Sequence, residues 1–116
     1  MNRLIVPVLA IIITVFSGLN AGAGESVTLT QTELGKLFPG SFQAVVNDAV
    51  TVQITARGNG TLIGQMTGQQ DSGRWSVQSG KLCIVWSTWL SGKASCSRVI
   101  SNDGWYHGNG VKFRKI

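Results

Sequence analysis

Few residues of this chain have the types and spacing that catalysis or metal binding requires. His107 is the single histidine, and Asp103 precedes it in a turn-like sequence. A triad would also need a nucleophile on a sharp elbow, and no such motif accompanies the histidine. Cys83 and Cys96 with His107 cannot fill four zinc positions unless carboxylates lie nearby. The sequence therefore predicts a protein that is not an enzyme and that has no metal or cofactor.

The acidic residues also argue against catalysis. Asp48, Asp71 and Asp103 lie in turn-like sequences, where an aspartate usually accepts hydrogen bonds from local backbone amides. Glu33 belongs to a predicted helix cap, and Glu25 precedes the predicted folded region. No pair of carboxylates remains for glycoside chemistry.

The N-terminal segment has the layout of a secretory signal peptide. Asn2-Arg3 is followed by an apolar run, Leu4–Phe16, and then by the small residues Ala21-Gly22-Ala23. The alternative is an uncleaved anchor, which would need roughly 20 apolar residues, whereas this run is shorter and contains Pro7. We expect cleavage after Ala23, a periplasmic or secreted protein, and no stable membrane span after cleavage.

The two cysteines predict a disulfide. An exported chain meets an oxidising environment, in which an even pair of cysteines normally closes. A Cys83–Cys96 bond would contribute on the order of 3 kcal/mol by restricting the unfolded state. The alternative, two buried free thiols, requires a reducing compartment, which the signal peptide argues against.

The excess of basic residues is mild, with a formal net charge of +5. Lys112 and Arg114 share one face of a predicted C-terminal strand. A solvated strand face or a protected sheet edge explains them simply. The alternative is contact with an anionic envelope component such as a lipid headgroup, a polysaccharide or an acidic protein. No basic-aromatic motif indicates nucleic acid.

One short helix is predicted after the leader. Thr30 and Glu33 have the capping-box spacing, Leu34 and Leu37 begin an apolar stripe, and Pro39-Gly40 ends it. We expect a helix of about two turns that packs its stripe against the core.

The rest of the chain predicts short strands joined by tight turns. Apolar and polar residues alternate from Val50 to Ala56, and Asn47-Asp48 before them forms a hairpin-type turn. The expected strands are 41–46, 50–57, 61–66, 74–78, 81–87, 95–100, 105–107 and 111–115.

Closure would remove the open edges of such a meander and would hide its tryptophans. We therefore expect an all-β fold, a small eight-stranded antiparallel up-and-down barrel, with a two-sheet β-sandwich as the alternative. Residues 24–29 are the expected flexible lead-in, and residues 30–116 form one monomeric domain.

Aromatic residues mark two candidate binding positions. Because Cys83 lies opposite Cys96 in this scheme, a long loop across 87–94 must carry Trp89 and Leu90, which could bind a partner or plug one barrel end. Trp105 and Tyr106 lie beside a turn, where aromatic side chains could stack on a ligand ring or sugar. Two other tryptophans, Trp75 and Trp86, share strand faces with apolar residues and are expected inside.

From Leu34 to Arg114 the chain resembles a family of small exported proteobacterial β-barrel domains of unknown function. The resemblance is carried by Gly58-Asn59-Gly60, Gly73-Arg74-Trp75, Leu82-Cys83 and the later Cys96. It implies a barrel fold and no particular activity.

A fainter resemblance is to the periplasmic metalloprotease inhibitors, which are small eight-stranded barrels with a Gly-x-Trp strand and one disulfide. Those inhibitors insert a free N-terminal trunk into the protease, and residues 24–29 would supply it here.

These observations predict an exported, non-enzymatic binding protein of the bacterial envelope, whose partner is a protein or a small envelope ligand. The alternative is an inhibitor of a secreted or periplasmic hydrolase. A ligand carrier should have an open cavity lined by tryptophan, whereas an inhibitor should have a solid barrel and an exposed trunk.

Overall fold

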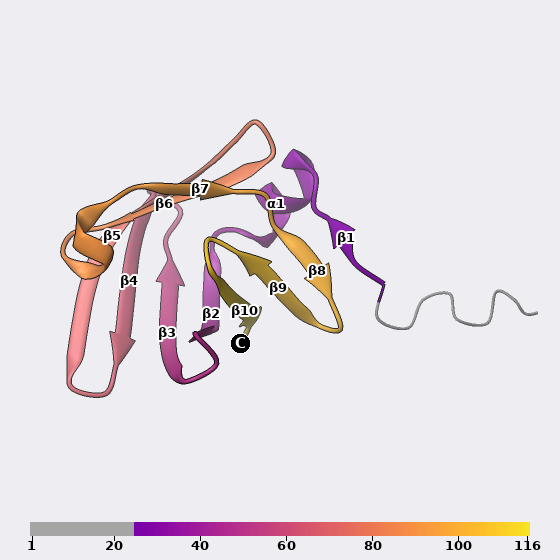
Figure 1. The fold of residues 1–116 in the computed structure, drawn as a ribbon. Helices are drawn as coiled ribbons and strands as arrows, with labels where there is room; N and C mark the ends of the chain where they lie inside the picture. The colour runs from indigo at the N-terminus through magenta and orange to yellow at the C-terminus, as the bar shows by residue number, and fades with distance from the viewer. Residues whose placement is uncertain (1–24) are drawn as a thin grey trace, which may run out of the picture.

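The computed structural model describes residues 25–116, so the predicted signal peptide lies outside the described residues. One helix and ten strands follow one another along this part of the chain (Figure 1). They are β1 (Val27–Thr28), α1 (Gln31–Leu37), β2 (Gly40–Val46), β3 (Val50–Ala56), β4 (Thr61–Met66), β5 (Gln69–Gln78), β6 (Lys81–Trp86), β7 (Ser95–Ser97), β8 (Ile100–Asn102), β9 (Trp105–Gly108) and β10 (Val111–Lys115).

The strands form one antiparallel sheet, which curls into a half-barrel (Figure 1). The strand order is β1-β8-β9-β10-β2-β3-β4-β5-β6-β7, so β1 and β7 are open edges. The all-β prediction is confirmed, but the prediction of a closed eight-stranded barrel is wrong. The alternative, a two-sheet β-sandwich, is also wrong, because the strands form a single sheet.

The barrel prediction fails at the segment that was expected to be one strand, 95–100. The chain forms β7 beside β6, bends at Arg98-Val99, and then forms β8 beside β9. Val99 is fully buried at this bend. At Val99 the chain leaves the edge of the sheet beside β6 and crosses to β9. β7 and β8 therefore lie far apart in the strand order although they are consecutive in sequence.

The tight turns have the positive backbone φ angles that their sequences favour. In the β2–β3 turn, Asn47 and Asp48 both have positive φ, at 54° and 55°. They are the central residues of a turn that the Ala49 amide closes by donating to the Val46 carbonyl at 3.1 Å. The β9–β10 turn uses Asn109 and Gly110 in the same way, at 55° and 79°. Local turn chemistry therefore sets the pairing of both hairpins.

The predicted capping box of α1 is present. Thr30 Oγ1 accepts from the Glu33 amide at 3.1 Å, and Glu33 Oε1 accepts from the Thr30 amide at 2.8 Å. Leu34 of α1 is fully buried. Gln31 ties α1 to the β5–β6 hairpin, because its side-chain oxygen accepts from the Gly80 amide at 2.5 Å. The helix thus covers one end of the half-barrel.

An aromatic cluster fills the core beside α1. The ring centroids of Phe38 and Phe42 are 4.7 Å apart, and those of Phe42 and Phe113 are 5.6 Å apart. Trp75 is half-buried against Phe38, at 5.5 Å between centroids.

Within the expected lead-in, residues 24–29, Val27–Thr28 forms β1 and pairs with β8.

Candidate functional site

The concave side of the half-barrel contains an apolar cavity of about 410 Å³. Its walls come from the inner faces of β2, β3, β4, β6 and β10 and from the loop after β6. Apolar side chains dominate the lining, among them Val46, Ile54, Met66, Ile84 and Val111. Among the described residues that line it, none is ionisable, and only Asn47 and Asn109 contribute polar side chains. The cavity therefore suits an uncharged, largely apolar group.

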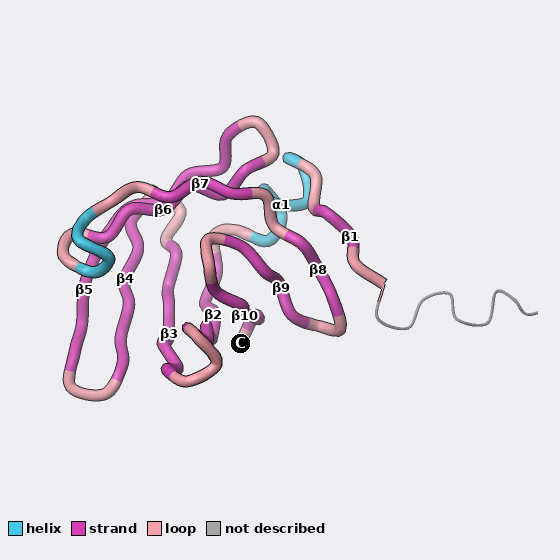
Figure 2. The backbone as a smooth tube through the Cα atoms, viewed as in Figure 1, coloured by secondary structure: helices cyan, strands magenta, loops and turns pink. Residues whose placement is uncertain are grey.

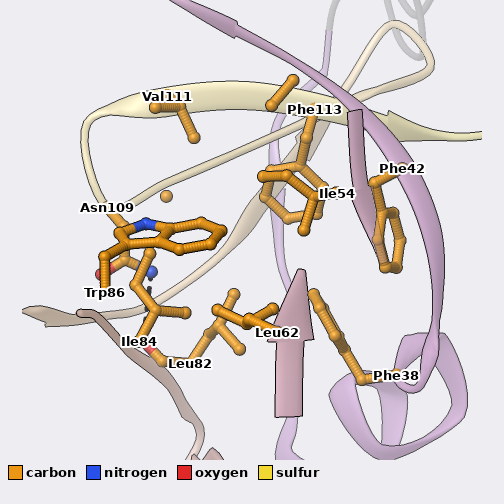
Figure 3. A pocket seen from close by; sticks show the side chains of 12 residues that line it. Phe38, Phe42, Ile54, Leu62, Leu82, Ile84, Trp86, Asn109, Val111 and Phe113 are labelled. Atoms are coloured by element: carbon orange, nitrogen blue, oxygen red, sulfur yellow. Dashed lines mark hydrogen bonds between the residues drawn. The ribbon is translucent and has the colours of Figure 1, made fainter. Parts of the chain in front are cut away.

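A smaller cavity of about 40 Å³ lies toward α1 and shares part of this lining. Figure 3 shows Trp86, Ile84 and Val111 at one side of it and Phe38 and Phe42 at the other. Trp86 lines both cavities, as do Ala44, Ile54, Ile84, Asn109 and Val111.

Two tryptophans form one wall of the large cavity. Trp86 ends β6, and Trp89 lies in a 3-10 turn, η3 (Trp89–Gly92), which is the cyan turn beside β5 in Figure 2. Their ring centroids are 4.9 Å apart. Gly64 of β4 leaves room for both rings, because a Cβ there would lie 2.5 Å from Trp89 Cζ3 and 2.8 Å from Trp86 Cη2. A side chain at position 64 would displace the pair.

Asp71 of β5 holds η3 in place. Its Oδ2 accepts from the amides of Thr88 and Trp89, both at 2.9 Å. The bond from the Trp89 amide is the main cause of a lowered carboxyl pKa, burial opposes it, and the Thr88 amide lowers the pKa further. The ionised carboxylate therefore positions Trp89 at the cavity.

Asn109 joins the two parts of the sheet that the strand order leaves separate. Ser95 Oγ donates to Asn109 Oδ1 at 2.7 Å, and Asn109 Nδ2 donates to the Leu82 carbonyl at 3.2 Å. The Asn109 amide also donates to Ser97 Oγ at 2.8 Å. Side-chain bonds from the β9–β10 turn thus reach β6 and β7, where a closed barrel would have a backbone ladder.

The disulfide is confirmed, since Cys83 and Cys96 are bonded and face one another on β6 and β7. The loop expected across 87–94 is also present at its end of the sheet. Within this loop Trp89 turns inward, whereas Leu90 is 62% exposed beside the cavity. The two residues of this predicted pair therefore have different environments.

The other predicted binding residues divide between the two faces of the sheet. Tyr106 lies inside against Phe113, at 5.5 Å between ring centroids. Trp105 lies on the opposite face, where the cations of Lys112 and Arg114 stand over its ring. Trp105 and Tyr106 therefore do not form one stacking site. Of the predicted binding residues, only Trp89 and Leu90 line the cavity.

Three positions that support the cavity were not predicted as functional: Gly64, Asp71 and Asn109. Asp71 has a turn-like sequence around it, but the actual turn comes earlier, at Thr67-Gly68. Asn109-Gly110 is a visible turn signal. The hydrogen-bond partners of the Asn109 side chain are distant in sequence, so the turn signal did not reveal that Asn109 joins the β9–β10 turn to β6 and β7.

Within residues 25–116 no three His, Cys, Asp or Glu side chains come together as a metal site would require. Within the same range no helix combines the length and apolar character needed to cross a bilayer.

Comparisons with known proteins give no match: no family model, no curated protein and no solved structure matches this chain. The resemblance to small exported barrel domains therefore stays a prediction. A proposal about function has to rest on the cavity itself.

Proposed function

We propose that this chain is an exported, non-enzymatic binding protein that takes one small, uncharged apolar group, such as an acyl chain, into the half-barrel. The observation that carries the proposal is the open cavity of about 410 Å³ with Trp86 and Trp89 in its wall. Small-molecule sites typically occupy about 300–1,000 Å³ and are lined by apolar and aromatic side chains with few polar groups.

The lining supports an uncharged occupant. Burying a charge without a partner is costly, and no ionisable side chain of the described residues lines this cavity. Asn109 already uses its amide to hold β6 and β7, which leaves Asn47 at the β2–β3 turn as the freer polar group. The ligand's polar end would therefore lie near this turn.

Two observations favour a ligand carrier over the alternative, a hydrolase inhibitor. The half-barrel contains open space lined by tryptophan, and Val27–Thr28 is paired with β8 rather than extended as a free trunk. The export part of the proposal is supported by the sequence of the leader and by the disulfide, which suits an oxidising compartment.

The test uses two neighbouring valines of β2 that face opposite sides of the sheet. Val46 lines the cavity, whereas Val45 lies on the outer face beside Lys112. We expect the full chain to bind N-phenyl-1-naphthylamine with saturation, and the uncharged alcohol decan-1-ol to displace it. Val46→Trp should abolish displaceable binding by filling the cavity, and Val45→Trp should preserve it. Equal binding by both variants, or no displaceable binding by the unmodified chain, would refute the proposal.

A further inference from the structure

A second surface on the outer face of the sheet combines a tryptophan with two cations. We call Trp105, Lys112 and Arg114 the basic-aromatic strip. Lys112 Nζ lies 4.9 Å from the Trp105 ring centroid, and Arg114 Cζ lies 4.7 Å from it. The strip faces away from the cavity, because the alternate residue Phe113 is buried in the core.

Strand register places further side chains around the strip. Ile100 and Lys112 both pair with His107, so these three residues form a row across β8, β9 and β10. Ile100 is 38% exposed, which leaves an aliphatic group beside the cations. Arg114 Nη2 donates to Gln43 Oε1 at 3.2 Å, so the guanidinium has an oriented position on the sheet.

The positive charge of the strip is weakly compensated. Lys112 Nζ lies 4.0 Å from Asp48 Oδ1, but the Asp48 side chain is 91% exposed. An exposed pair at this distance is strongly screened and contributes little. The helix α1 does not cover the strip either, since it packs mainly against β5 and β6 and reaches β10 through Lys115, which alternates with Arg114 along the strand. The two cations are therefore accessible to an anionic partner.

We propose that the basic-aromatic strip docks this protein on an anionic lipid bilayer. Lysine and arginine hold their charges at headgroup level while their stems cover apolar surface, and tryptophan favours the same interface. The exposed Ile100 adds a group that gains from contact with acyl chains. This surface is separate from the cavity and does not depend on the function proposed for it.

An anionic polysaccharide is the competing partner, and the geometry favours it less. Binding of a sugar ring normally uses an open aromatic face, whereas Lys112 and Arg114 already stand over the ring of Trp105. A sugar would have to displace cations that its own acidic groups need. A bilayer surface can contact the cations while they remain on the indole.

The test measures sedimentation of the oxidised full chain with two kinds of vesicle, pure phosphatidylcholine and phosphatidylcholine with 30% phosphatidylglycerol. The strip variant is Lys112→Gln with Arg114→Gln. The matched control is Lys36→Gln with Lys81→Gln, which removes the same charge from exposed positions on α1 and β6. All variants share one N-terminal segment, so its contribution to vesicle binding cancels.

We expect the strip variant to lose about 25-fold in partitioning to the anionic vesicles, from roughly fivefold for each of the two cations. The control pair should lose less than about threefold, because its charges would lie beyond a Debye length of the surface. Phosphatidylcholine vesicles should not distinguish the two variants. Near-ultraviolet circular dichroism checks that both variants remain folded.

Two results would overturn the proposal. Equal partitioning of the strip and control variants to anionic vesicles would show that the strip does not contact the bilayer. Tight binding of soluble polygalacturonate that only the strip variant loses, with vesicle binding unchanged, would assign the strip to a polysaccharide instead.

Discussion

Removal of the Asn109 side chain should loosen the contact between the β9–β10 turn and β6–β7 without changing the turn itself. Asn109→Gly preserves the positive φ of 55°, which glycine adopts freely. It deletes the hydrogen bonds from Ser95 Oγ and to the Leu82 carbonyl, while the backbone bond to Ser97 Oγ can persist. At about 1 kcal/mol for each bond, the two lost bonds should lower the free energy of unfolding by about 2 kcal/mol, in addition to the cost of the flexibility that glycine adds to the unfolded chain.

A matched control separates this loss from the flexibility that glycine adds to the unfolded chain. Asn47 has nearly the same φ, 54°, in the equivalent position of the β2–β3 turn. Among the described residues its side chain has no hydrogen-bond partner, so Asn47→Gly should carry only the cost of added unfolded-state freedom, about 0.4–1 kcal/mol. The difference between the two variants reports the contribution of the Asn109 side-chain bonds alone.

The assay is urea unfolding of the oxidised protein followed by tryptophan fluorescence, with thermal unfolding as a second probe. A loss of about 2 kcal/mol corresponds to a lower Tm by about 8–16 °C for a domain of this size. A double-mutant cycle with Ser95→Ala should give a coupling energy of about 1 kcal/mol. If Asn109→Gly and Asn47→Gly differ by less than about 0.5 kcal/mol, the Asn109 side chain does not hold the β9–β10 turn against β6 and β7, and this reasoning is refuted.

Three further changes test the cavity wall and the disulfide. Gly64→Ala should destabilise the protein by about 1–3 kcal/mol and alter its tryptophan fluorescence, because the added Cβ would meet the rings of Trp86 and Trp89; unchanged emission would contradict this. The lowered pKa of Asp71 makes its ionised form stabilising above the unfolded-state pKa of about 3.9, a contribution that is lost as pH falls through the folded-state pKa. Asp71→Asn should remove this part of the acid-induced change in Trp89 fluorescence, and identical acid profiles would count against the role of the carboxylate. Cys83→Ser should cost about 2–5 kcal/mol in unfolding free energy, measured by urea titration, and an unchanged midpoint would argue against a stabilising disulfide.

Features that depend on neighbouring residues could be predicted from the sequence. The capping box at Thr30 and Glu33 forms within one helical turn, and the Asn47-Asp48 turn needs only residues that tolerate positive φ. The pairing of Cys83 with Cys96 followed from their being the two cysteines of a chain expected to be exported, and the structure has this bond. In each case the interacting groups are close in the chain, so spacing alone limits the possible arrangements.

The supports of the cavity could not be predicted in this way. Asp71 bonds amides at Thr88 and Trp89, and Asn109 bonds groups on β6 and β7. A turn-like sequence around an aspartate or asparagine is compatible with many such partners. Only the curvature of the sheet brings these groups within hydrogen-bond distance.

By itself the sequence determined an all-β chain with a capped helix, a sequence of hairpins and a disulfide, because hydrophobic alternation, turn residues and cysteine spacing act locally. Tertiary structure decided that the sheet stays open. At Val99 the choice between continuing a strand and burying a side chain depends on the whole core. The same long-range packing turned Tyr106 inward and Trp105 outward, and so separated an apolar cavity from a basic-aromatic strip that the sequence shows only as neighbouring residues.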